Sequence, residues 1–426
     1  MAMENRYDKY KDSGIAWIGD IPEHWKVIPH KRIMRKKKII KEFYAGENIL
    51  SLTKKGVIIR DLEAGGKMPT TFNGYQVLYP DNLLMCLFDI DVTPRCVGII
   101  KDEGLSSPAY SQFILNELGY TPFFDYLLRY MDDEKCLLHL SKNLRNSLTE
   151  DDFGQIETIV PSFPEQQAIA DYLDWKCGEI DELITLQEEM ITKLQSYKQS
   201  VITEAVTKGL DKNVPLKDSG IEWIGEIPEH WSKNKIIRLF SIIGSGTTPK
   251  SSKEDNYNGS INWIQSGDIN GGDIEICKNT ISYTAFKEYP ALKIYQAPFI
   301  IVAMYGASVG NISISQIDGC VNQACCVMNE TKQNFKYLFY AMNSVKKYLI
   351  YRAEGGGQPN ISQDKIKNTW LPIPPLSEQQ SIADYLDQRC SEINELISIK
   401  QQKIEKLKEY KKSLIFECVT GKRKVS

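Results

Sequence analysis

Few polar side chains in this sequence have the types and spacing that catalysis needs. The glycine-rich segment GSGTTP at 244–249 departs from the dinucleotide-binding pattern GxGxxG at its last position, and the sequence contains no GxxxxGK[ST] phosphate loop. The tract LPIPP at 371–375 lacks the acidic or amide residue that precedes paired prolines in amino-methyltransferases. These patterns argue against a nucleotide-hydrolysing or methyl-transferring site in this chain.

Two further sets of titratable residues could do chemistry. Asp81, Asp133 and Lys135 are the residue types of a nuclease metal site, and they carry the alternative of a self-sufficient endonuclease, although they lie far apart in the sequence. His24 and His230 sit in two copies of the sequence Pro-Glu-His-Trp, which favours a repeated structural corner over acid–base catalysis. We therefore predict no catalytic residue and no metal site.

Composition is that of an ordinary globular protein, with 42% hydrophobic and 25% charged residues in a chain of 426. That length predicts two to four domains. The 52 basic residues are balanced by 55 acidic ones, so any surface for a polyanion must be a local concentration of Lys and Arg. The ten cysteines show no CxxC spacing and favour buried thiols in a reducing cytoplasm, and no apolar run approaches the ~20 residues of a membrane helix.

The sequence contains a long internal repeat. The segment KDSGIAWIGDIPEHW at 11–25 recurs as KDSGIEWIGEIPEHW at 217–231, and EQQAIADYLDWKCGEIDELI at 165–184 recurs as EQQSIADYLDQRCSEINELI at 378–397. The residues between the repeats, 26–164 and 232–377, share little similarity. A common framework that carries two different inserts would produce this contrast.

The second repeated segment predicts long helices over 165–207 and 378–420, because neither stretch contains an interior proline. Ser162 with Glu165, and Ser377 with Gln380, have the spacing of capping boxes at their starts. Apolar residues at seven-residue spacing predict an antiparallel coiled coil whose two inserts are related by a pseudo-twofold axis. The predicted seam consists of Leu173, Ile180, Leu183, Met190, Leu194, Tyr197, Leu386, Ile393, Leu396, Leu407, Tyr410 and Leu414.

Both inserts are expected to be α+β, with strand-like runs such as 82–88, 96–100, 299–304 and 311–315. Eight basic residues and no acidic one lie between Lys26 and Lys41, which fits either a solvated face or a nucleic-acid surface. Polar residues in turn-rich places could pair with bases or phosphates. These candidates are Lys54, Lys55, Arg60, Lys67, Asn73, Tyr75, Gln76, Arg95, Lys142, Asn143, Arg145, Ser245, Thr247, Thr248, Lys250, Gln265, Ser266, Tyr305, Ser308, Asn311, Gln358 and Asn360.

The twin DSGIxWIGxIPxHW segments, the twin EQxxIAxYLD helices and the endings EAVT and ECVT resemble the DNA-specificity subunits of type I restriction–modification enzymes. The resemblance covers the whole chain in the same segment order. It implies an α+β fold in which two globular target-recognition domains are separated by two long antiparallel coiled-coil helices. Each domain would then read one half of a bipartite DNA site, and the helices would set the gap.

The resemblance also implies a division of the chain and a set of partners. Residues 1–26 and 213–232 would be repeated segments, 27–160 and 233–376 the target-recognition domains, and 161–212 and 377–426 the spacer helices. The chain would be a non-catalytic cytoplasmic protein that binds no cofactor. Its partners would be double-stranded DNA, two modification subunits that use S-adenosylmethionine, and restriction subunits that use ATP and Mg. A scaffold or adaptor with two ligand-binding inserts is the main alternative.

Overall fold

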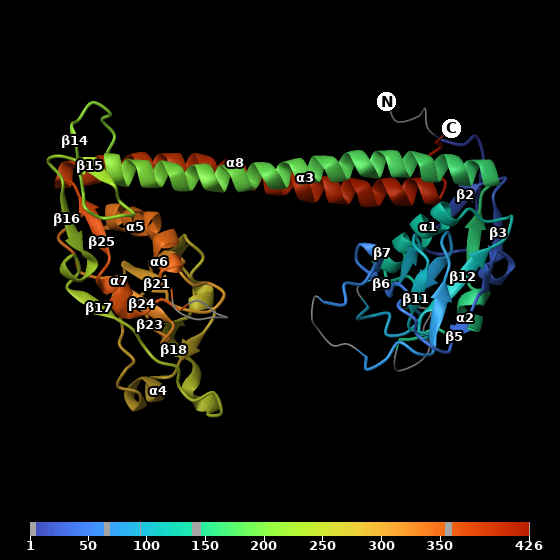
Figure 1. The fold of residues 1–426 in the computed structure, drawn as a ribbon, viewed down its shortest axis with the longest axis horizontal. Coiled ribbons are helices and arrows are strands. Elements are labelled where there is room, and N and C mark those ends of the chain that lie inside the picture. The colour runs from blue at the N-terminus through green and yellow to red at the C-terminus, as the bar shows by residue number, and fades with distance from the viewer. Residues whose placement is uncertain (1–5, 64–68, 94, 139–145, 354–359, 426) are drawn as a thin grey trace. The chain divides into compact units, whose positions relative to one another are not determined.

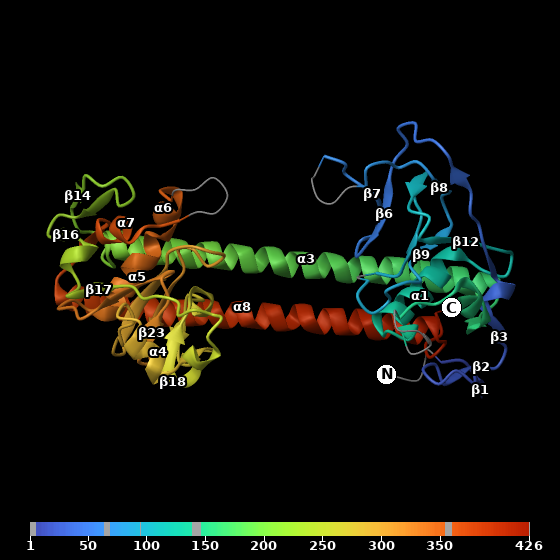
Figure 2. The same cartoon turned by 90° about the horizontal axis from the view of Figure 1, so that it is seen from below.

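The computed structural model describes residues 6–63, 69–93, 95–138, 146–353 and 360–425. The chain divides into two compact units: unit 1 contains Met1–Glu188 and Gln401–Ser426, and unit 2 contains Glu189–Lys400. The long helices α3 (Phe163–Lys208) and α8 (Leu376–Val419) therefore each contribute residues to both units. Figures 1 and 2 show the elements of each unit from two directions. In the described part of the chain, no helix is long and apolar enough to cross a membrane.

Unit 1 places an α+β insert between a short hairpin and the first half of α3 (Figure 1). Its helices besides α3 are α1 (Thr121–Asp133) and α2 (Glu150–Gln155). Its strands are β1 (Tyr10–Asp12), β2 (Asp20–Pro22), β3 (Lys26–Pro29), β4 (Met34–Lys36), β5 (Ile40–Lys41), β6 (Leu50–Thr53), β7 (Gly56–Ile59), β8 (Tyr75–Leu78), β9 (Leu83–Met85), β10 (Val97–Ile99), β11 (Gly104–Ser106), β12 (Ser111–Leu115) and β13 (Glu157–Val160).

Unit 2 repeats this order with a different insert. Its helices besides α8 are α4 (Tyr283–Glu288), α5 (Phe335–Ser344), α6 (Lys346–Tyr351) and α7 (Gln363–Lys367). Its strands are β14 (Leu216–Asp218), β15 (Glu226–Pro228), β16 (Ser232–Lys235), β17 (Ile242–Gly244), β18 (Tyr257–Ile264), β19 (Asp273–Ile274), β20 (Thr280–Ile281), β21 (Phe299–Ala303), β22 (Ile312–Ser315), β23 (Cys320–Val321), β24 (Cys325–Asn329) and β25 (Trp370–Ile373).

The two inserts contain the same central antiparallel sheet, although their sequences differ. The strand order is β10-β9-β12-β4 in unit 1 and β22-β21-β24-β17 in unit 2, where β19 is added at one edge. The register also agrees: β12 faces β4 and β9 through the pairs Phe113–Lys36 and Ser111–Met85, and β24 faces β17 and β21 through Val327–Gly244 and Cys325–Ala303. The duplication therefore extends through the inserts, at the level of the backbone.

Each unit is completed by the end of the long helix that belongs to the other repeat. In unit 1, Leu414, Cys418 and Val419 of α8 pack in one core with Trp25 and Leu173. In unit 2, the equivalent residues Val201, Ala205 and Val206 of α3 pack with Trp231 and Leu386. Burial of these apolar side chains supplies the main driving force for the pairing. The expected antiparallel pairing of α3 with α8 is thus present within each unit.

The same polar contact is also made twice between the paired helices. The Nζ of Lys411 donates to both carboxylate oxygens of Asp181, at 2.7 Å each, in unit 1. The Nζ of Lys198 donates to the side-chain oxygen of Asn394, at 2.8 Å, in unit 2. The repeat offset of the helices is 411 − 198 = 213, and 394 − 181 gives the same value.

The structure corrects one flank of the predicted seam. Leu173, Ile180, Leu386, Ile393 and Leu414 are buried, and Leu194 and Leu407 are half-buried, as expected. The expected second set is wrong, because its members Leu183, Met190, Tyr197, Leu396 and Tyr410 are all more than 40% exposed. Their places are taken by Cys177, Ile184, Ile191, Cys390, Ile397 and Ile404. Apolar residues lie at heptad spacing on both flanks, so the period alone does not distinguish them.

The helix starts follow the sequence prediction in one repeat only. The backbone N–H and the hydroxyl of Ser162 both donate to Oε2 of Glu165, at 3.1 and 2.7 Å, just before α3. Both helices begin two residues before their predicted starts, α3 at Phe163 and α8 at Leu376, so Ser162 precedes α3 but Ser377 lies inside the first turn of α8. Pro375 precedes this helix where Ser162 precedes α3, and a proline has no side-chain acceptor for the cap.

Candidate nucleic-acid interface

A glutamate at the start of each long helix anchors the repeated hairpin. Oε1 of Glu165 lies 2.8 Å from Nε2 of His24 and accepts from Nε1 of Trp25 at 3.3 Å. Burial of Glu165 opposes ionisation, but hydrogen bonds from Ser162, His24 and Trp25 outweigh it and lower the pKa of the carboxyl. The expected role of His24 as part of a structural corner is confirmed.

The second corner repeats the first. Glu378 lies 2.8 Å from Nε2 of His230 and accepts from Nε1 of Trp231 at 3.0 Å. The indole of Trp231, like that of Trp25, is almost completely buried. The two Pro-Glu-His-Trp motifs therefore fasten each hairpin to the start of the long helix in its own unit.

The glutamine after each glutamate anchors the insert. Oε1 of Gln166 accepts from the backbone N–H of Tyr120, which precedes α1, and its Nε2 donates to the carbonyl of Leu118. Oε1 of Gln379 accepts from the backbone N–H of Asn334, which precedes α5. Both amides are fully buried, so each hydrogen bond lacks competition from water. The Glu-Gln pair thus joins hairpin, helix and insert in each unit.

In unit 2, one end of the central sheet gathers most of the predicted DNA-binding residues of that insert. Strands β17 and β21 end there, and β22 and β24 begin there. The connecting loops are held together by backbone hydrogen bonds, from Met304 to the carbonyl of Ala324 and from Ile361 to the carbonyl of Met304. The residues brought to this end are Ser245, Thr247, Thr248, Gln265, Ser266, Tyr305, Ser308, Asn311 and Asn360, with Lys250 further along the first loop.

Specific contacts fix the first of these loops. A Cβ at Gly246 would lie 1.7 Å from the carbonyl oxygen of Val321, so no larger residue fits there. The hydroxyl of Tyr295 donates to the carbonyl of Ser245 at 2.9 Å, and burial raises the pKa of this phenol to about 12. The hydroxyl thus stays protonated as a donor near neutral pH.

Gln323 is a residue of this surface that the sequence analysis missed. It is exposed in the turn between β23 and β24, and its Oε1 accepts from the hydroxyl of Thr248 at 2.5 Å. An exposed amide beside an exposed hydroxyl is the kind of group that pairs with base edges. The sequence Val-Asn-Gln-Ala at 321–324 could have indicated this residue, because its polar Asn-Gln pair joins two strand-like runs.

One predicted contact residue in each insert has its amide occupied within the protein. Asn311 donates to the carbonyl of Ile269 at 3.0 Å and accepts from Nζ of Lys346 at 2.7 Å. Gln76 is completely buried, and its Nε2 donates to the carbonyls of Ser107 and Tyr110, at 2.8 Å each. These two residues support loops and do not present their side chains to a ligand.

Most other candidates of the first insert lie away from the equivalent sheet end. Lys54 and Lys55 form the turn between β6 and β7, and Arg60 follows β7. Asn73 and Tyr75 lie at the start of β8, where Asn73 accepts from the backbone N–H of Tyr44. Arg95 is an exception, because it lies in the loop between β9 and β10 at this sheet end, where it is ion-paired with Asp133 at 3.0 Å. Lys67, Lys142, Asn143, Arg145 and Gln358 lie outside the described residues.

Register equivalence identifies a different set of residues at this end in unit 1. Lys37 and Lys38 follow β4, as Ser245 and Gly246 follow β17. Nζ of Lys37 lies 3.5 Å from the ring centroid of Tyr79, and the rings of Phe88 and Tyr110 lie 5.9 Å apart. Lysines at the surface suit contact with the phosphates of DNA. The signal was the basic run from Lys26 to Lys41, which the sequence analysis left open between two interpretations.

The nuclease alternative gains no support from the geometry. Asp133 is paired with Arg95, and Lys135 with Asp132. Asp81 occupies the turn between β8 and β9 with a φ of 64°. Among the residues that the structure describes, no group of three or more His, Cys, Asp or Glu side chains could hold a metal ion.

The fold and these surfaces define a recognition subunit, in which a duplicated framework presents two different polar surfaces. Residues 228–409 match the family described as type I restriction modification DNA specificity domain. The putative type I restriction enzyme MjaX specificity subunit of Methanocaldococcus jannaschii is 27% identical over 70% of this chain and 67% of its own length. The EcoBI specificity subunit of Escherichia coli is 25% identical over 54% of this chain and 51% of its own length.

Solved structures show the same fold. A chain in a structure of a type I restriction–modification system, described as the basis of its complex assembly and conformational transition, has a TM-score of 0.70 at 14% identity. The match covers 94% of this chain and 98% of that chain. The HsdS subunit from Thermoanaerobacter tengcongensis has a TM-score of 0.50 at 15% identity, with the same coverage. Over residues 228–409 this chain is similar to the DNA specificity domain of type I restriction–modification enzymes, and the solved structures share its fold over nearly its whole length.

Proposed function

We propose that the two sheet ends each read one half of a bipartite DNA sequence. The observation that carries this proposal is their equivalence: the same strands end there in both units, yet the exposed side chains differ. Unit 2 presents hydroxyls and amides, which can pair with base edges, and unit 1 presents lysines beside aromatic rings. Two different surfaces on one framework fit a target with two unlike halves.

We assign the chemistry of the complex to partner subunits. Modification subunits, two per chain, would methylate adenine with S-adenosylmethionine, and restriction subunits would use ATP and Mg. The chain itself would bind no cofactor and would act in the cytoplasm on double-stranded DNA. The parts of α3 and α8 that continue from one unit to the other would set the unread gap between the half-sites.

The exposed apolar side chains of α3 and α8 support a docking face for the modification subunits. Leu183 and Leu186 of α3 are 42% and 49% exposed, and the equivalent residues Leu396 and Ile399 of α8 are 47% and 51% exposed. In each helix they lie at i and i+3 spacing, which is part of the pattern by which one helix packs on another. Apolar residues repeated this way on a water-facing flank indicate a partner.

The proposal is tested by expressing the chain with its modification subunit and mapping methylated adenines on genomic DNA. We expect a split motif with a gap of fixed length. Exchange of residues 233–376 for another insert should change one half of that motif completely and leave the other half intact. A change in both halves would contradict modular recognition, and a complex that methylates no defined motif would favour a scaffold.

The role of the helices needs a separate variant. Insertion of one helical turn into both α3 and α8, near the unit boundaries at 188/189 and 400/401, should lengthen the preferred gap. The half-sites themselves should not change. An unaltered gap in a folded variant would show that the helices do not act as the spacer.

A further inference from the structure

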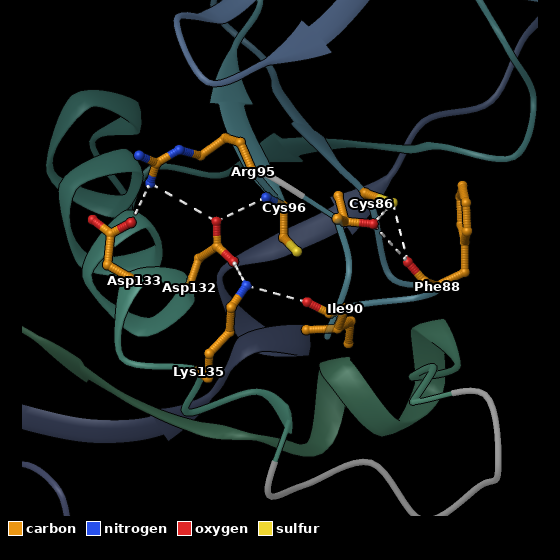
Figure 3. Close-up of polar contacts among 9 residues, drawn as sticks. Cys86, Phe88, Ile90, Arg95, Cys96, Asp132, Asp133 and Lys135 are labelled. Carbon is orange, nitrogen blue, oxygen red and sulfur yellow. Dashed lines mark hydrogen bonds and ion pairs between the residues drawn. The ribbon is translucent and has the colours of Figure 1, made fainter. Parts of the chain in front are cut away.

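A buried carboxylate at the end of α1 holds the loop that follows β9. The side chain of Asp132 is 2% exposed, and its Oδ2 accepts from the backbone N–H of Cys96 at 2.8 Å. Cys96 lies directly before β10 and is the last residue of the loop 86–96 (Figure 3). A charged acceptor makes this hydrogen bond stronger than one between neutral groups. The loop is thus tied to α1 at one end.

Two cations complete this anchor. Nζ of Lys135 lies 3.3 Å from Oδ1 of Asp132 and donates to the carbonyl of Ile90 at 3.2 Å, in the middle of the same loop (Figure 3). Lys135 has a φ of 54°, a conformation that is costly for a residue with a side chain. Arg95 lies 3.8 Å from Asp132 and is paired with Asp133. The carboxylate therefore organises contacts at two points of the loop.

Burial disfavours ionisation of the two thiols in this cluster. Burial, followed by the charge of Asp132, raises the pKa of Cys96. Burial also raises the pKa of Cys86, whose backbone N–H donates to the carbonyl of Cys96 at 2.8 Å. A thiol that stays protonated is neither a nucleophile nor a metal ligand. The cluster is therefore built for position.

Unit 2 has an anchor at the same place with the opposite charge. Tyr120 and Asn334 are equivalent, because each donates its backbone N–H to the buried glutamine of its unit, and they differ by 334 − 120 = 214. Adding 214 to 132 gives Lys346 as the counterpart of Asp132. Nζ of Lys346 donates to the side-chain oxygen of Asn311 at 2.7 Å, and burial lowers the pKa of this lysine. Asn311 lies directly before β22 and ends the loop 304–311, and under the same offset it corresponds to Val97, the residue after Cys96.

Strand register supports this equivalence independently. Gly98 faces Leu84 in unit 1, and Ile312 faces Val302 in unit 2, so β10 and β22 also differ by 312 − 98 = 214. An acceptor at the end of α1 and a donor at the start of α6 thus each hold the equivalent loop of their own unit. Packing alone would not need a charged group at position 132 or 346. Asp132 and Lys346 differ in charge, but each is bonded to the loop that lies at the proposed reading surface of its own unit.

We propose that Asp132 and Lys346 are positioning residues for DNA recognition, each setting the loop of its own unit without touching the DNA. This inference rests on the proposed function. It makes the specificity of each half-site depend on a residue at the far side of the loop. Because each chain contains both anchors, one half-site serves as the internal control for the other.

The test measures discrimination in the full complex with modification subunits. Methylation rates are compared on the wild-type target and on duplexes with one base changed, first in one half and then in the other. We expect Asp132→Ala to reduce discrimination about tenfold in the half read by unit 1, as expected from loss of one charged hydrogen bond, and by less than about twofold in the other half. Lys346→Met should do the reverse.

Two further variants keep the test decisive. Asp132→Asn can still accept from Cys96 but lacks the charge, so it should give an intermediate loss even if Asp132→Ala does not fold. Glu134→Gln removes a charge that pairs with Lys412 and should change neither half-site. Folded variants with unchanged discrimination in both halves would overturn the positioning role, as would equal losses in both halves. A wild-type complex without any motif would instead overturn the proposed function.

Discussion

The two units make equivalent contacts between the hairpin, the start of the long helix and the insert. They differ in which residues the inserts bury and which they expose. Glu165 and Glu378 each bind the histidine and tryptophan of their own hairpin, and Gln166 and Gln379 accept from the residue before α1 and before α5. Behind these contacts, unit 1 buries His30 and Asp125 where unit 2 has Ile236 and Phe339. A few fixed hydrogen bonds and one sheet register thus suffice to hold unrelated inserts in the same fold.

The difference in buried residues predicts that the units respond differently to pH. Among the described groups, His30 and Asp125 have their pKa values moved to about 4 and about 6, both mainly by burial. Neither counterpart in unit 2 can ionise. Unit 1 should therefore carry a pH dependence that unit 2 lacks at these positions, and substitution of His30 or Asp125 by a residue that cannot ionise should remove it.

The largest effect is expected at the framework corners. Glu165→Ala leaves the donors of His24, Trp25 and Ser162 without their acceptor, so unit 1 should lose about 3 kcal/mol of unfolding free energy. Glu378→Ala should cost unit 2 only about 1 kcal/mol, because Glu378 is 41% exposed whereas Glu165 is 18% exposed. Denaturant unfolding measures both, with Glu23→Ala as an exposed control. Equal losses would show that burial does not distinguish the corners.

The next effect concerns acid stability through His30. Its imidazole is completely buried, with Nδ1 3.2 Å from the carbonyl of Phe153 and Nε2 without a partner in the described structure. Because its folded pKa lies below the unfolded value of 6.5, its contribution is present above pH 6.5 and is lost as pH falls toward 4. His30→Ile should therefore gain about 2 kcal/mol relative to wild type between pH 7 and pH 4.5.

Unfolding of both proteins by denaturant at the two pH values measures this gain. Lys31→Gln is the matched control, because it removes an exposed side chain from the same short turn as His30. A difference in unfolding free energy between His30→Ile and wild type that stays constant from pH 7 to pH 4.5 would contradict the prediction.

Asp125 should produce a dependence of opposite sign. Its side chain is 5% exposed, and burial raises the pKa to about 6 even though Oδ2 lies 2.7 Å from Arg129. Its contribution to stability is full below pH 4 and is lost as pH rises through 6. Asp125→Asn should therefore gain about 2 kcal/mol relative to wild type between pH 4 and pH 7. If the unfolding free energy of Asp125→Asn instead fell relative to wild type between pH 4 and pH 7, the pKa of Asp125 would not be raised.

The sequence was sufficient for the parts of the fold that depend on local pattern or on the repeat. Both long helices lie within two residues of their predicted ends, and the predicted strands around 82–88 and 311–315 are present in shortened form. The equivalence of His24 with His230 was visible because their neighbours are identical in both copies. Repetition within one chain replaced any outside comparison.

The parts that could not be predicted depend on tertiary contacts. Lys37 and Ser245 are equivalent only through the register of β4 and β17, two strands that have no residue type in common. Gln76 looked like a contact residue, but strand pairing buries it beneath the loop that it supports. Residue type indicates which groups could meet DNA, whereas the sheet determines which of them reach the same surface.

The smallest effect on stability is expected on the exposed flank of the long helices, where the repeats again differ. Leu186 and its equivalent Ile399 are both apolar, whereas Met190 corresponds to Lys403. All lie on the water-facing flank, so Leu186→Lys and Met190→Lys should each change the unfolding free energy by less than about 0.5 kcal/mol. A lysine at 190 copies what the other repeat already tolerates.

Binding of the modification subunit should separate these two variants. Leu186→Lys should weaken it about tenfold, because a charge would enter an apolar contact, and Met190→Lys should change it by less than about twofold. Titration of each variant with the purified modification subunit measures this difference. If both variants weakened binding equally, Met190 would contact the subunit while its equivalent Lys403 would not, and the two helices would dock differently. If Leu186→Lys left binding unchanged, the docking face would lie elsewhere.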